Sequence, residues 1–337
     1  MTTNRAAWQE KPGVKLDIRA APYTAPQENE LVVKVHAWAI NPIDKITQEV
    51  DLSFVKYPLV TGMDLAGEVV EVGSNVESRF SKGDRVLAMT DGALSGTPSQ
   101  SAFQEYVVAH SVLASPIPDA ISYPEAVVFP LTLATAAVGL FQKDFLGLQL
   151  PSTPPRPATG KTVLIWGGAS AVGCNAIQLC TAAGYNVITT ASPANFDYLK
   201  SLGASAVFDY KSPTVVEDVV AAINETDLAG ILHAAGSVAI CLEVSGKANG
   251  SAFVAASLPI PEDGPAGVKG KMIFANTIKA NEVGPAVFRD FLPEALRNGS
   301  YRVAPEPLVV GTGLESIQEG LEVWRKGVSA RKIVITR

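Results

Sequence analysis

The stretch Thr162–Gly173, which reads TVLIWGGASAVG, decides the fold. Its apolar start, Thr162–Trp166, predicts a buried strand, and a helix is expected to follow at Ala171–Ala183. Between them lies a turn of small residues: Gly168, Ser170, Ala171, Val172 and Gly173. Small residues here let the backbone approach a pyrophosphate at the positive end of a helix. The alternative is a plain glycine turn in an α/β sheet, but the strand–turn–helix context favours a dinucleotide site.

Strand and helix segments alternate on the carboxyl side of this turn. Strands are expected at Asn186–Thr190, Ala206–Asp209, Gly230–Ala234, Ala252–Ala256 and Lys271–Ala275, and helices at Phe196–Leu202 and Val215–Ile223. Such alternation predicts a parallel sheet covered by helices on both faces.

The first 110 residues have a different pattern. Short apolar runs punctuated by Gly and Pro occur at Leu31–Ala39, Gly62–Gly73, Gly83–Ala88 and Phe103–Val108, which predicts a barrel-like β domain. A helix is expected at Pro124–Phe141, and residues 147–160 (GLQLPSTPPRPATG) contain four prolines, so an irregular loop is expected there. Beyond Lys279 we expect helices at Ala286–Asn298 and Gly313–Lys326, and a last strand, Lys332–Thr336, that could return to the first domain.

Composition excludes some classes of function. The 337 residues carry a formal net charge of −6 and no basic run, so binding to nucleic acid or to an anionic membrane is not expected. The N-terminus has no apolar signal-peptide core, and no uninterrupted apolar run is long enough to suggest a membrane span. Three sparse cysteines are typical of reduced thiols, so a cytoplasmic protein is expected.

The second predicted strand indicates which dinucleotide is bound. NAD sites usually place Asp or Glu about 20 residues after the glycines, to hold the ribose 2′-hydroxyl. Here the strand ends in Thr189-Thr190-Ala191-Ser192, without a carboxylate that would repel a 2′-phosphate. Ser192 and Asn195 can donate hydrogen bonds, and Lys200 can add positive charge, which favours NADPH. Ser192 and Asn195 could also simply cap the next helix.

A series of motifs in order resembles the medium-chain dehydrogenase/reductase superfamily over nearly the whole chain. They are Asn41-Pro42-Ile43-Asp44, GMDLAGEVVEVG at 62–73, Gly83-Asp84-Arg85-Val86, Phe103-Gln104-Glu105-Tyr106, residues 130–136 (PLTLATA) and the nucleotide turn. The resemblance implies an α/β protein with a GroES-like β-barrel domain at 1–125 and 280–337. A Rossmann domain with a doubly wound parallel sheet would be inserted at 126–279.

Many members of that superfamily bind catalytic zinc, which needs Cys, His or carboxylate ligands. Asn41 occupies the family's first cysteine position, and Met63 stands where its Gly-His-Glu motif has histidine. His36, His110 and His233 lie in separate predicted elements, and His36 and His233 are expected to be core residues with satisfied hydrogen bonds. We therefore expect no metal site, and the chain resembles the zinc-independent quinone oxidoreductases and enoyl reductases.

The branch implies hydride transfer from NADPH to the conjugated C=C of an enone or enoyl thioester. A quinone reductase and a cofactor-binding protein without turnover are the alternatives. The spacing Asn41–Lys45 and the proline-rich loop are also similar to fungal trans-acting enoyl reductases, which places Lys45 near the nicotinamide ribose as a proton relay. A solvated surface lysine is the other interpretation.

The resemblance assigns further residues to the site. Tyr57 is a possible proton donor, although packing before Pro58 is favoured, and Thr135 is expected to face the nicotinamide or to be an ordinary helix residue. Cofactor contacts are also expected from Asn41, Asp44, Lys45, Tyr210, Val328 and Ser329. The expected partner is a small conjugated carbonyl compound, and the chain could be a monomer or a homodimer.

Overall fold

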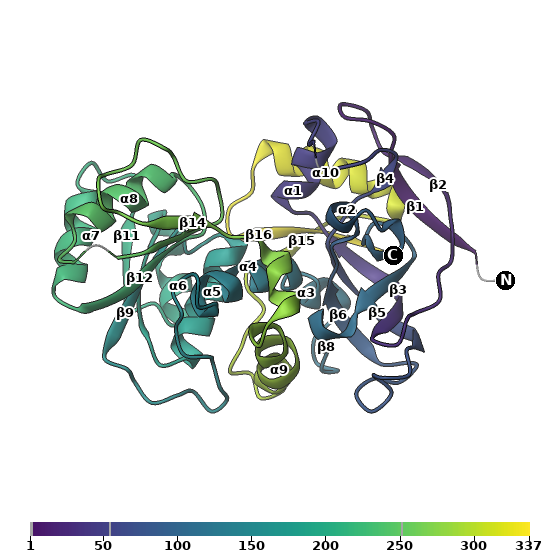
Figure 1. Ribbon diagram of the computed structural model, residues 1–337, viewed down its shortest axis with the longest axis horizontal. Coiled ribbons are helices and arrows are strands. Elements are labelled where there is room, and N and C mark those ends of the chain that lie inside the picture. Colours follow the sequence, from purple (N-terminus) through teal and green to yellow (C-terminus); the bar gives the residue numbers. More distant parts are fainter. Residues whose placement is uncertain (1–2, 54, 251) are drawn as a thin grey trace. The chain divides into compact units, whose positions relative to one another are not determined.

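The computed structural model describes residues 3–53, 55–250 and 252–337, and the chain forms two compact units (Figure 1). Unit 1 consists of Met1–Leu131 and Glu306–Arg337, and unit 2 of Thr132–Pro305. Both chain ends therefore build unit 1, and unit 2 is inserted between them. Residues 280–305, which the family resemblance places in the GroES-like domain, form part of the compact unit 2.

Unit 1 is built on a seven-stranded sheet with the order β15-β16-β3-β5-β6-β8, in which β7 also pairs with β3. The other strands of unit 1 form a three-stranded sheet with the order β2-β1-β4. The last strand, β16, pairs antiparallel with β3, so the chain does return to the first domain. The strand bounds are β1 Asn4–Gln9, β2 Asp17–Ala21, β3 Glu30–Ala39, β4 Leu59–Val60, β5 Asp64–Val72, β6 Arg85–Met89, β7 Tyr106–His110, β8 Ala114–Pro116, β15 Glu306–Thr312 and β16 Arg331–Thr336.

Short helices join these strands. They are α1 Pro42–Glu49, α2 Gly92–Ser95, η1 Pro98–Gln100, η2 Ser111–Leu113, α3 Tyr123–Ala126, η6 Leu314–Ser316 and α10 Ile317–Lys326. The core of unit 1 gathers alternate apolar residues of β3 and β5 with Phe80, Phe103 and Leu321 of the intervening segments. This period-two alternation gives a sheet one face that packs on a core.

Unit 2 contains a six-stranded parallel sheet with the order β11-β10-β9-β12-β13-β14. This is the order of a doubly wound dinucleotide-binding sheet, in which the first strand, β9, lies beside the fourth, β12. The strand bounds are β9 Lys161–Trp166, β10 Asn186–Ala191, β11 Ala206–Asp209, β12 Asp227–His233, β13 Val254–Ala256 and β14 Gly270–Met272.

Helices cover both faces of this sheet (Figure 1). Leu164 and Trp166 of β9 share a core with α7 and α8, whereas a Cβ on Gly139 of α4 would lie 2.7 Å from Leu232 on the other face. The fold class expected from the sequence is confirmed. The helices of unit 2 are α4 Pro130–Phe141 (which begins in unit 1), α5 Ala171–Ala182, η3 Pro193–Asn195, α6 Phe196–Ser201, α7 Val215–Asn224, α8 Val238–Lys247, η4 Ala275–Ala280, the π-helical η5 Pro285–Phe291 and α9 Leu292–Arg297.

Some elements differ from the expectation. The single helix expected at Pro124–Phe141 is two helices, α3 and α4, because Pro130 disfavours helical geometry at the residue before it and starts a new helix instead. The helix expected at Ala286–Asn298 begins as a π-helix, η5. Helices α1 and α8 had not been expected from the sequence pattern.

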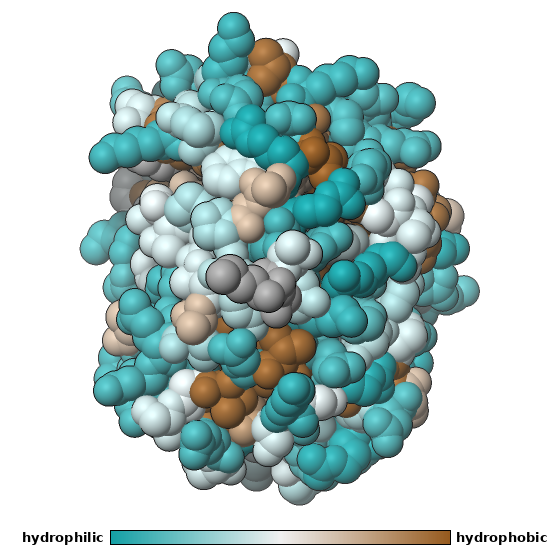
Figure 2. All heavy atoms as spheres, turned by 90° about the vertical axis from the view of Figure 1, so that its right-hand side faces the viewer, coloured by the Kyte–Doolittle hydropathy of each residue, from teal (hydrophilic) through white to brown (hydrophobic). Residues whose placement is uncertain are grey.

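The segment Tyr123–Phe141 is the one candidate membrane span that the described residues contain, by length and apolar composition. In the structure, 83% of its apolar window is buried, which is typical of a core helix. Figure 2 shows one face of the molecule, where hydrophilic side chains predominate and apolar ones gather in small separate groups. The three cysteines are free thiols and all are buried.

Candidate active site

The glycine-rich turn of unit 2 is held in place by its own hydrogen bonds. Gly167 follows β9 with a φ of 88°, a conformation that suits glycine. Ser170 is the N-cap of α5: its hydroxyl donates to the Gly167 carbonyl at 2.8 Å and accepts from the Gly173 amide at 3.0 Å. The hydroxyl of Ser170 therefore orders the turn from within.

Two glycines let the turn pack closely on its neighbours. A Cβ on Gly173 would lie 2.3 Å from the Gly167 carbonyl oxygen and 2.6 Å from the Gly168 Cα. A Cβ on Gly168 would lie 2.3 Å from Oγ1 of Thr189. Gly173 is thus required for the close approach of α5 to the strand–turn segment, and its Cα faces the protein backbone.

The start of α5 is suited to an anion. The amides of Gly173 and Cys174 bond to Ser170, whereas the amides of Ala171 and Val172 have no partner within the described part of the chain. Unpaired amides at the start of a 12-residue helix, at the positive end of its dipole, are a ready-made site for a phosphate group.

The second strand supports the turn and then ends in polar residues. Thr190 Oγ1 accepts a hydrogen bond from the Gly167 amide at 3.0 Å, and Thr189 Oγ1 donates to the Ile165 carbonyl at 2.6 Å. Ser192 and Asn195 stand at the N-cap positions of η3 and α6, but neither side chain makes a capping hydrogen bond. The capping interpretation of these two residues therefore has no support from their geometry.

These residues lie at the carboxyl ends of β9, β10 and β11, beside the point where the strand order reverses. Ligands of doubly wound sheets bind in the crevice at this point. Ala191 pairs with Asp209, so Ser192 and Tyr210 follow adjacent strand ends, and Tyr210 is 45% exposed. The turn, Ser192, Asn195 and Tyr210 are thus brought to one edge of the sheet.

His233 ends β12 at the same edge and is fully buried. Its Nε2 lies 3.1 Å from the Gly236 carbonyl oxygen, and its Nδ1 lies 3.3 Å from Ser257 Oγ, so both ring nitrogens have partners. Burial lowers the pKa of His233. His36 differs from the expectation, because its Nε2 is buried with no hydrogen-bond partner in the described residues, although the ring stacks on Tyr123 at 4.6 Å.

In unit 1, a buried polar network lies at the start of α1. Asn41 Nδ2 donates to Asp64 Oδ2 at 2.8 Å, and Lys332 Nζ donates to Asn41 Oδ1 at 2.5 Å. Lys332 Nζ also pairs with Asp64 Oδ2 at 3.1 Å. Asp44 Oδ2 accepts from the Asn41 amide at 2.8 Å. All four residues are at most 5% exposed, so Asn41 and Asp44, expected at the cofactor, bond within the protein.

The surroundings of Asp44 change its ionisation. Burial raises its pKa from 3.8 to about 7, and the charge of Asp64 raises it as well. Hydrogen bonds from the Asn41 and Gly62 backbones and the charge of Lys332 act in the opposite direction. The ammonium of Lys332 pairs with Asp64 and acts on Asp44 only as a nearby charge, and Asp44 exchanges a proton near neutral pH.

The side chains of Lys45 and Tyr57 both contact residues of α1. Lys45 Nζ lies 2.5 Å from Glu49 Oε2 and 5.9 Å from the centroid of the Trp324 ring, and its side chain is 28% exposed. Tyr57 donates its hydroxyl to the Thr47 carbonyl at 2.9 Å, and burial raises its pKa. Both side chains are tied to α1, so their assignment to catalysis stays a prediction.

The remaining expected residues differ in exposure. Thr135 is half-buried on α4, between Ala134 and Ala136, which are 0% exposed. Val328 and Ser329 are exposed in the segment that precedes β16. The next residue, Ala330, has a φ of 49°, a left-handed conformation that is unfavourable for alanine.

The residues present do not fit a zinc ion. No group of three His, Cys, Asp or Glu side chains suited to a metal occurs at 3–53, 55–250 or 252–337. At the start of α1 the amide of Asn41 and the carboxylate of Asp64 face an ammonium, that of Lys332. A cationic side chain beside these oxygens disfavours a second cation there.

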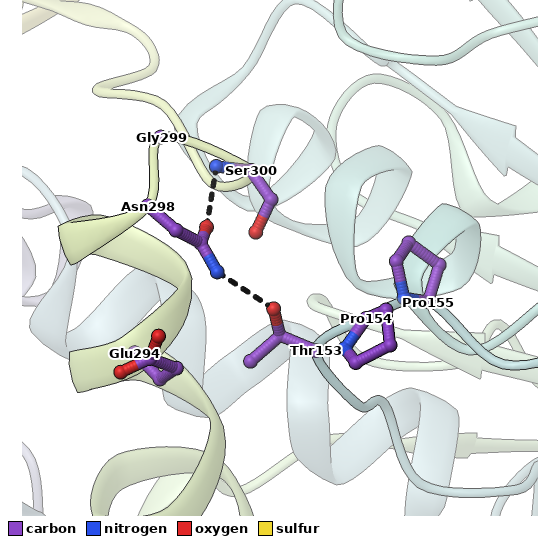
Figure 3. A pocket seen from close by; sticks show the side chains of 7 residues that line it. All are labelled: Thr153, Pro154, Pro155, Glu294, Asn298, Gly299 and Ser300. Atoms are coloured by element: carbon purple, nitrogen blue, oxygen red, sulfur yellow. Dashed lines mark hydrogen bonds between the residues drawn. The ribbon is translucent and has the colours of Figure 1, made fainter.

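A pocket of about 450 Å³ lies in unit 2 between the proline-rich loop and the end of α9 (Figure 3). Asn298 bridges it by donating to Thr153 Oγ1 at 2.9 Å. None of the site residues expected from the sequence lines this pocket, and its lining offers no group suited to hydride transfer. The residues that line it are Thr153, Pro154, Pro155, Glu294, Asn298, Gly299 and Ser300.

Comparison with known proteins agrees with this architecture. Residues 27–119 match the family model of the alcohol dehydrogenase GroES-like domain, and residues 171–279 match that of the zinc-binding dehydrogenases. The solved structure of an alcohol dehydrogenase superfamily protein from Novosphingobium aromaticivorans superposes with a TM-score of 0.79 at 26% identity, over 100% of both chains.

Two fungal relatives match almost end to end. The protein called dehydrogenase azaJ, from Aspergillus niger, is 50% identical and covers 100% of this chain and 99% of its own. The protein called trans-enoyl reductase himH, from Aspergillus japonicus, is 38% identical and covers 98% of this chain and 97% of its own. Two domain matches in order and full-length relatives above 30% identity determine the family.

Proposed function

Because this chain belongs to the medium-chain dehydrogenase/reductase family of nicotinamide-dependent oxidoreductases, in the branch of quinone oxidoreductases and fungal trans-enoyl reductases, we propose that it reduces a conjugated C=C with NADPH. The acceptor is an enone or an enoyl thioester. The observation that carries the proposal is the full-length match to a relative named trans-enoyl reductase.

The cofactor half of the proposal rests on unit 2. The unpaired amides of Ala171 and Val172 offer a seat for the diphosphate, and bound NADPH would supply the hydride. Ser192 and Asn195 would meet the 2′-phosphate at an edge where β10 ends without a carboxylate. Tyr210 would lie along the adenosine phosphate.

The chemistry needs no metal-bound electrophile. The β-carbon of a conjugated carbonyl accepts a hydride, and the resulting enolate on the substrate takes a proton at its α-carbon. The protein then mainly supplies orientation and electrostatics. Lys45 and Thr135 would face the nicotinamide half of the cofactor, and Lys45, Tyr57 or a water molecule would deliver the proton.

The test is NADPH oxidation by the purified protein with an enone, an enoyl thioester and a quinone. We expect kcat/KM for the enone or enoyl thioester to exceed that for the quinone at least tenfold. A preference for the quinone would make the protein a quinone reductase. Tight NADPH binding without oxidation of the cofactor by any acceptor would make it a binding protein.

The choice of cofactor has a separate test in Ser192→Asp. A carboxylate beside the 2′-phosphate should raise the Kd for NADPH about tenfold through charge repulsion, while the Kd for NADH changes little. Ser192→Asn, of the same size but neutral, is the matched control and should keep the preference. Equal losses for both cofactors in the Asp variant would contradict the assignment of the 2′-phosphate.

A further inference from the structure

Asp64 is a buried carboxylate that joins three separate elements. It is 0% exposed and accepts hydrogen bonds from the side chain of Asn41 at the start of α1, at 2.8 Å, and from the amide of Leu131 in the first turn of α4, at 2.7 Å. Its third contact is the ammonium of Lys332 on β16, at 3.1 Å. The donors come from residues 41, 131 and 332 of the sequence, so Asp64 ties together segments that are far apart in the chain.

Lys332 closes this arrangement into a triangle. Its ammonium donates to Asn41 Oδ1 at 2.5 Å while it pairs with Asp64, and Asn41 Nδ2 donates to the same carboxylate. The Asn41 amide is therefore fixed at both ends, with its oxygen toward the ammonium and its nitrogen toward the carboxylate. Either charge left alone would be buried and unpaired.

The pair is unlike most ion pairs of the molecule. Its side chains are 5% and 0% exposed, whereas Arg331, the neighbour of Lys332 on β16, and Glu306 are 47% and 66% exposed. Removing two charges from water offsets much of their attraction, so a buried pair contributes little stability compared with apolar side chains of the same size. A role other than stability is the better reason for placing charges here.

That role follows from what the triangle holds. Asn41 is the N-cap of α1, the helix that carries Asp44 and Lys45, and Lys332 follows the segment of Val328 and Ser329. All of these are residues that the family resemblance assigns to the cofactor, and Lys45 is placed at the nicotinamide ribose. Movement of the triangle would displace both segments together.

We propose that Asp64 and Lys332 are positioning residues that hold the start of α1 in the geometry required by the nicotinamide half of NADPH. The inference rests on the proposed function. In a family whose model is named for zinc binding, the cation that orders this site is a lysine ammonium.

The experiment compares two probes on the full-length protein. NADPH has an adenosine half and a nicotinamide half, whereas adenosine 2′,5′-bisphosphate has only the adenosine half, which the glycine-rich turn of unit 2 would hold. The key variant is the neutral pair Asp64→Asn with Lys332→Met, which avoids an unpaired buried charge. We expect its Kd for NADPH to rise at least tenfold and its kcat to fall at least tenfold, with the Kd for the bisphosphate within twofold of wild type. Arg331→Met, one residue away on the same strand, is the matched control and should change none of these.

The outcomes separate a positioning role from a structural one. Wild-type NADPH affinity and kcat in the neutral double variant would overturn the proposal, as would equal losses for the two probes. Should that variant not fold, Asn41→Ala removes the amide and leaves the ion pair intact. We expect the same selective loss of NADPH, and an unchanged ratio of the two Kd values would overturn the proposal. Failure of the wild-type protein to bind NADPH would instead refute the proposed function.

Discussion

The two units prepare their candidate sites in different ways. In unit 2 the backbone forms the candidate site: Gly168 and Gly173 allow close approach, Ser170 orders the turn, and two helix amides have no partner among the residues that the structure describes. In unit 1 the start of α1 is held by buried charged and amide side chains around Asp64. The comparison shows that one site depends on the absence of side chains and the other on their charges, so the two should respond differently to substitution and to pH.

The largest expected effect is at the glycine turn. Gly173→Ala places a methyl group 2.3 Å from the Gly167 carbonyl oxygen and 2.6 Å from the Gly168 Cα, and backbone atoms cannot yield as a flexible side chain does. We expect a loss of about 2–4 kcal/mol in the free energy of unfolding, measured by urea denaturation. The Kd for NADPH should rise at least tenfold, because the unpaired amides of α5 would move with the helix.

The matched control is Gly246→Ala in α8, where the nearest atom to the new methyl group is Pro265 Cβ at 3.3 Å. Its stability should stay within about 1 kcal/mol of the parent, since alanine also favours helix over glycine. If Gly173→Ala kept the stability and the NADPH affinity of the wild type, the close approach of α5 would not be needed. The site of unit 2 would then not depend on the absence of a side chain at this position.

The second prediction concerns pH and belongs to unit 1. The pKa of Asp44 is about 7 in the folded protein and about 3.8 in the unfolded chain, so the folded state binds the extra proton between these values. Asp44 therefore contributes most favourably below pH 4, and its contribution is lost as pH rises toward 7, with no further loss above. Asp44→Asn cannot ionise and should not show this loss.

The measurement is the free energy of unfolding of both proteins at pH 5 and pH 8. From pH 5 to pH 8, Asp44→Asn should gain on the order of 2 kcal/mol relative to wild type. Asp84→Asn is a suitable control, because Asp84 likewise accepts a hydrogen bond from a backbone amide, that of Ser81 at 2.8 Å, but is only partly buried. A constant difference between Asp44→Asn and wild type at the two pH values would contradict the assignment of a raised pKa.

The same contrast explains what could be predicted from the sequence. The turn of unit 2 lies within twelve consecutive residues, and its backbone geometry dictates their small size, so TVLIWGGASAVG was sufficient to predict strand, turn and helix. The network of unit 1 joins residues 41, 44, 64 and 332, which no local pattern connects. Motif resemblance identified Asn41 and Asp44 but gave no sign that Lys332 pairs with Asp64. The lysine in an otherwise apolar last strand was one signal in the sequence.

Two rationales drawn from the sequence also change. Small residues of the turn, Gly173 among them, were expected to let the backbone approach a pyrophosphate, yet a Cβ at Gly173 would meet protein backbone first. Helix α1 was not expected, because its apolar stripe is short, although Pro42 at its first turn is a common start for a helix. At α1, periodicity misses a helix whose start is ordered mainly by polar contacts.

The smallest expected effect concerns Ala330, and it tests whether the left-handed backbone conformation before Lys332 is needed for NADPH binding. Ala330 has a φ of 49°, where an L-residue with a Cβ loses about 1 kcal/mol and glycine does not. Glycine also gains freedom in the unfolded chain, so Ala330→Gly should raise the free energy of unfolding by at most about 1 kcal/mol. The Kd for NADPH should stay within twofold, because the triangle of Asn41, Asp64 and Lys332 still fixes the start of β16. A clear loss of NADPH affinity without loss of stability would mean instead that the rigid backbone at Ala330, and not the buried triangle alone, places Val328 and Ser329.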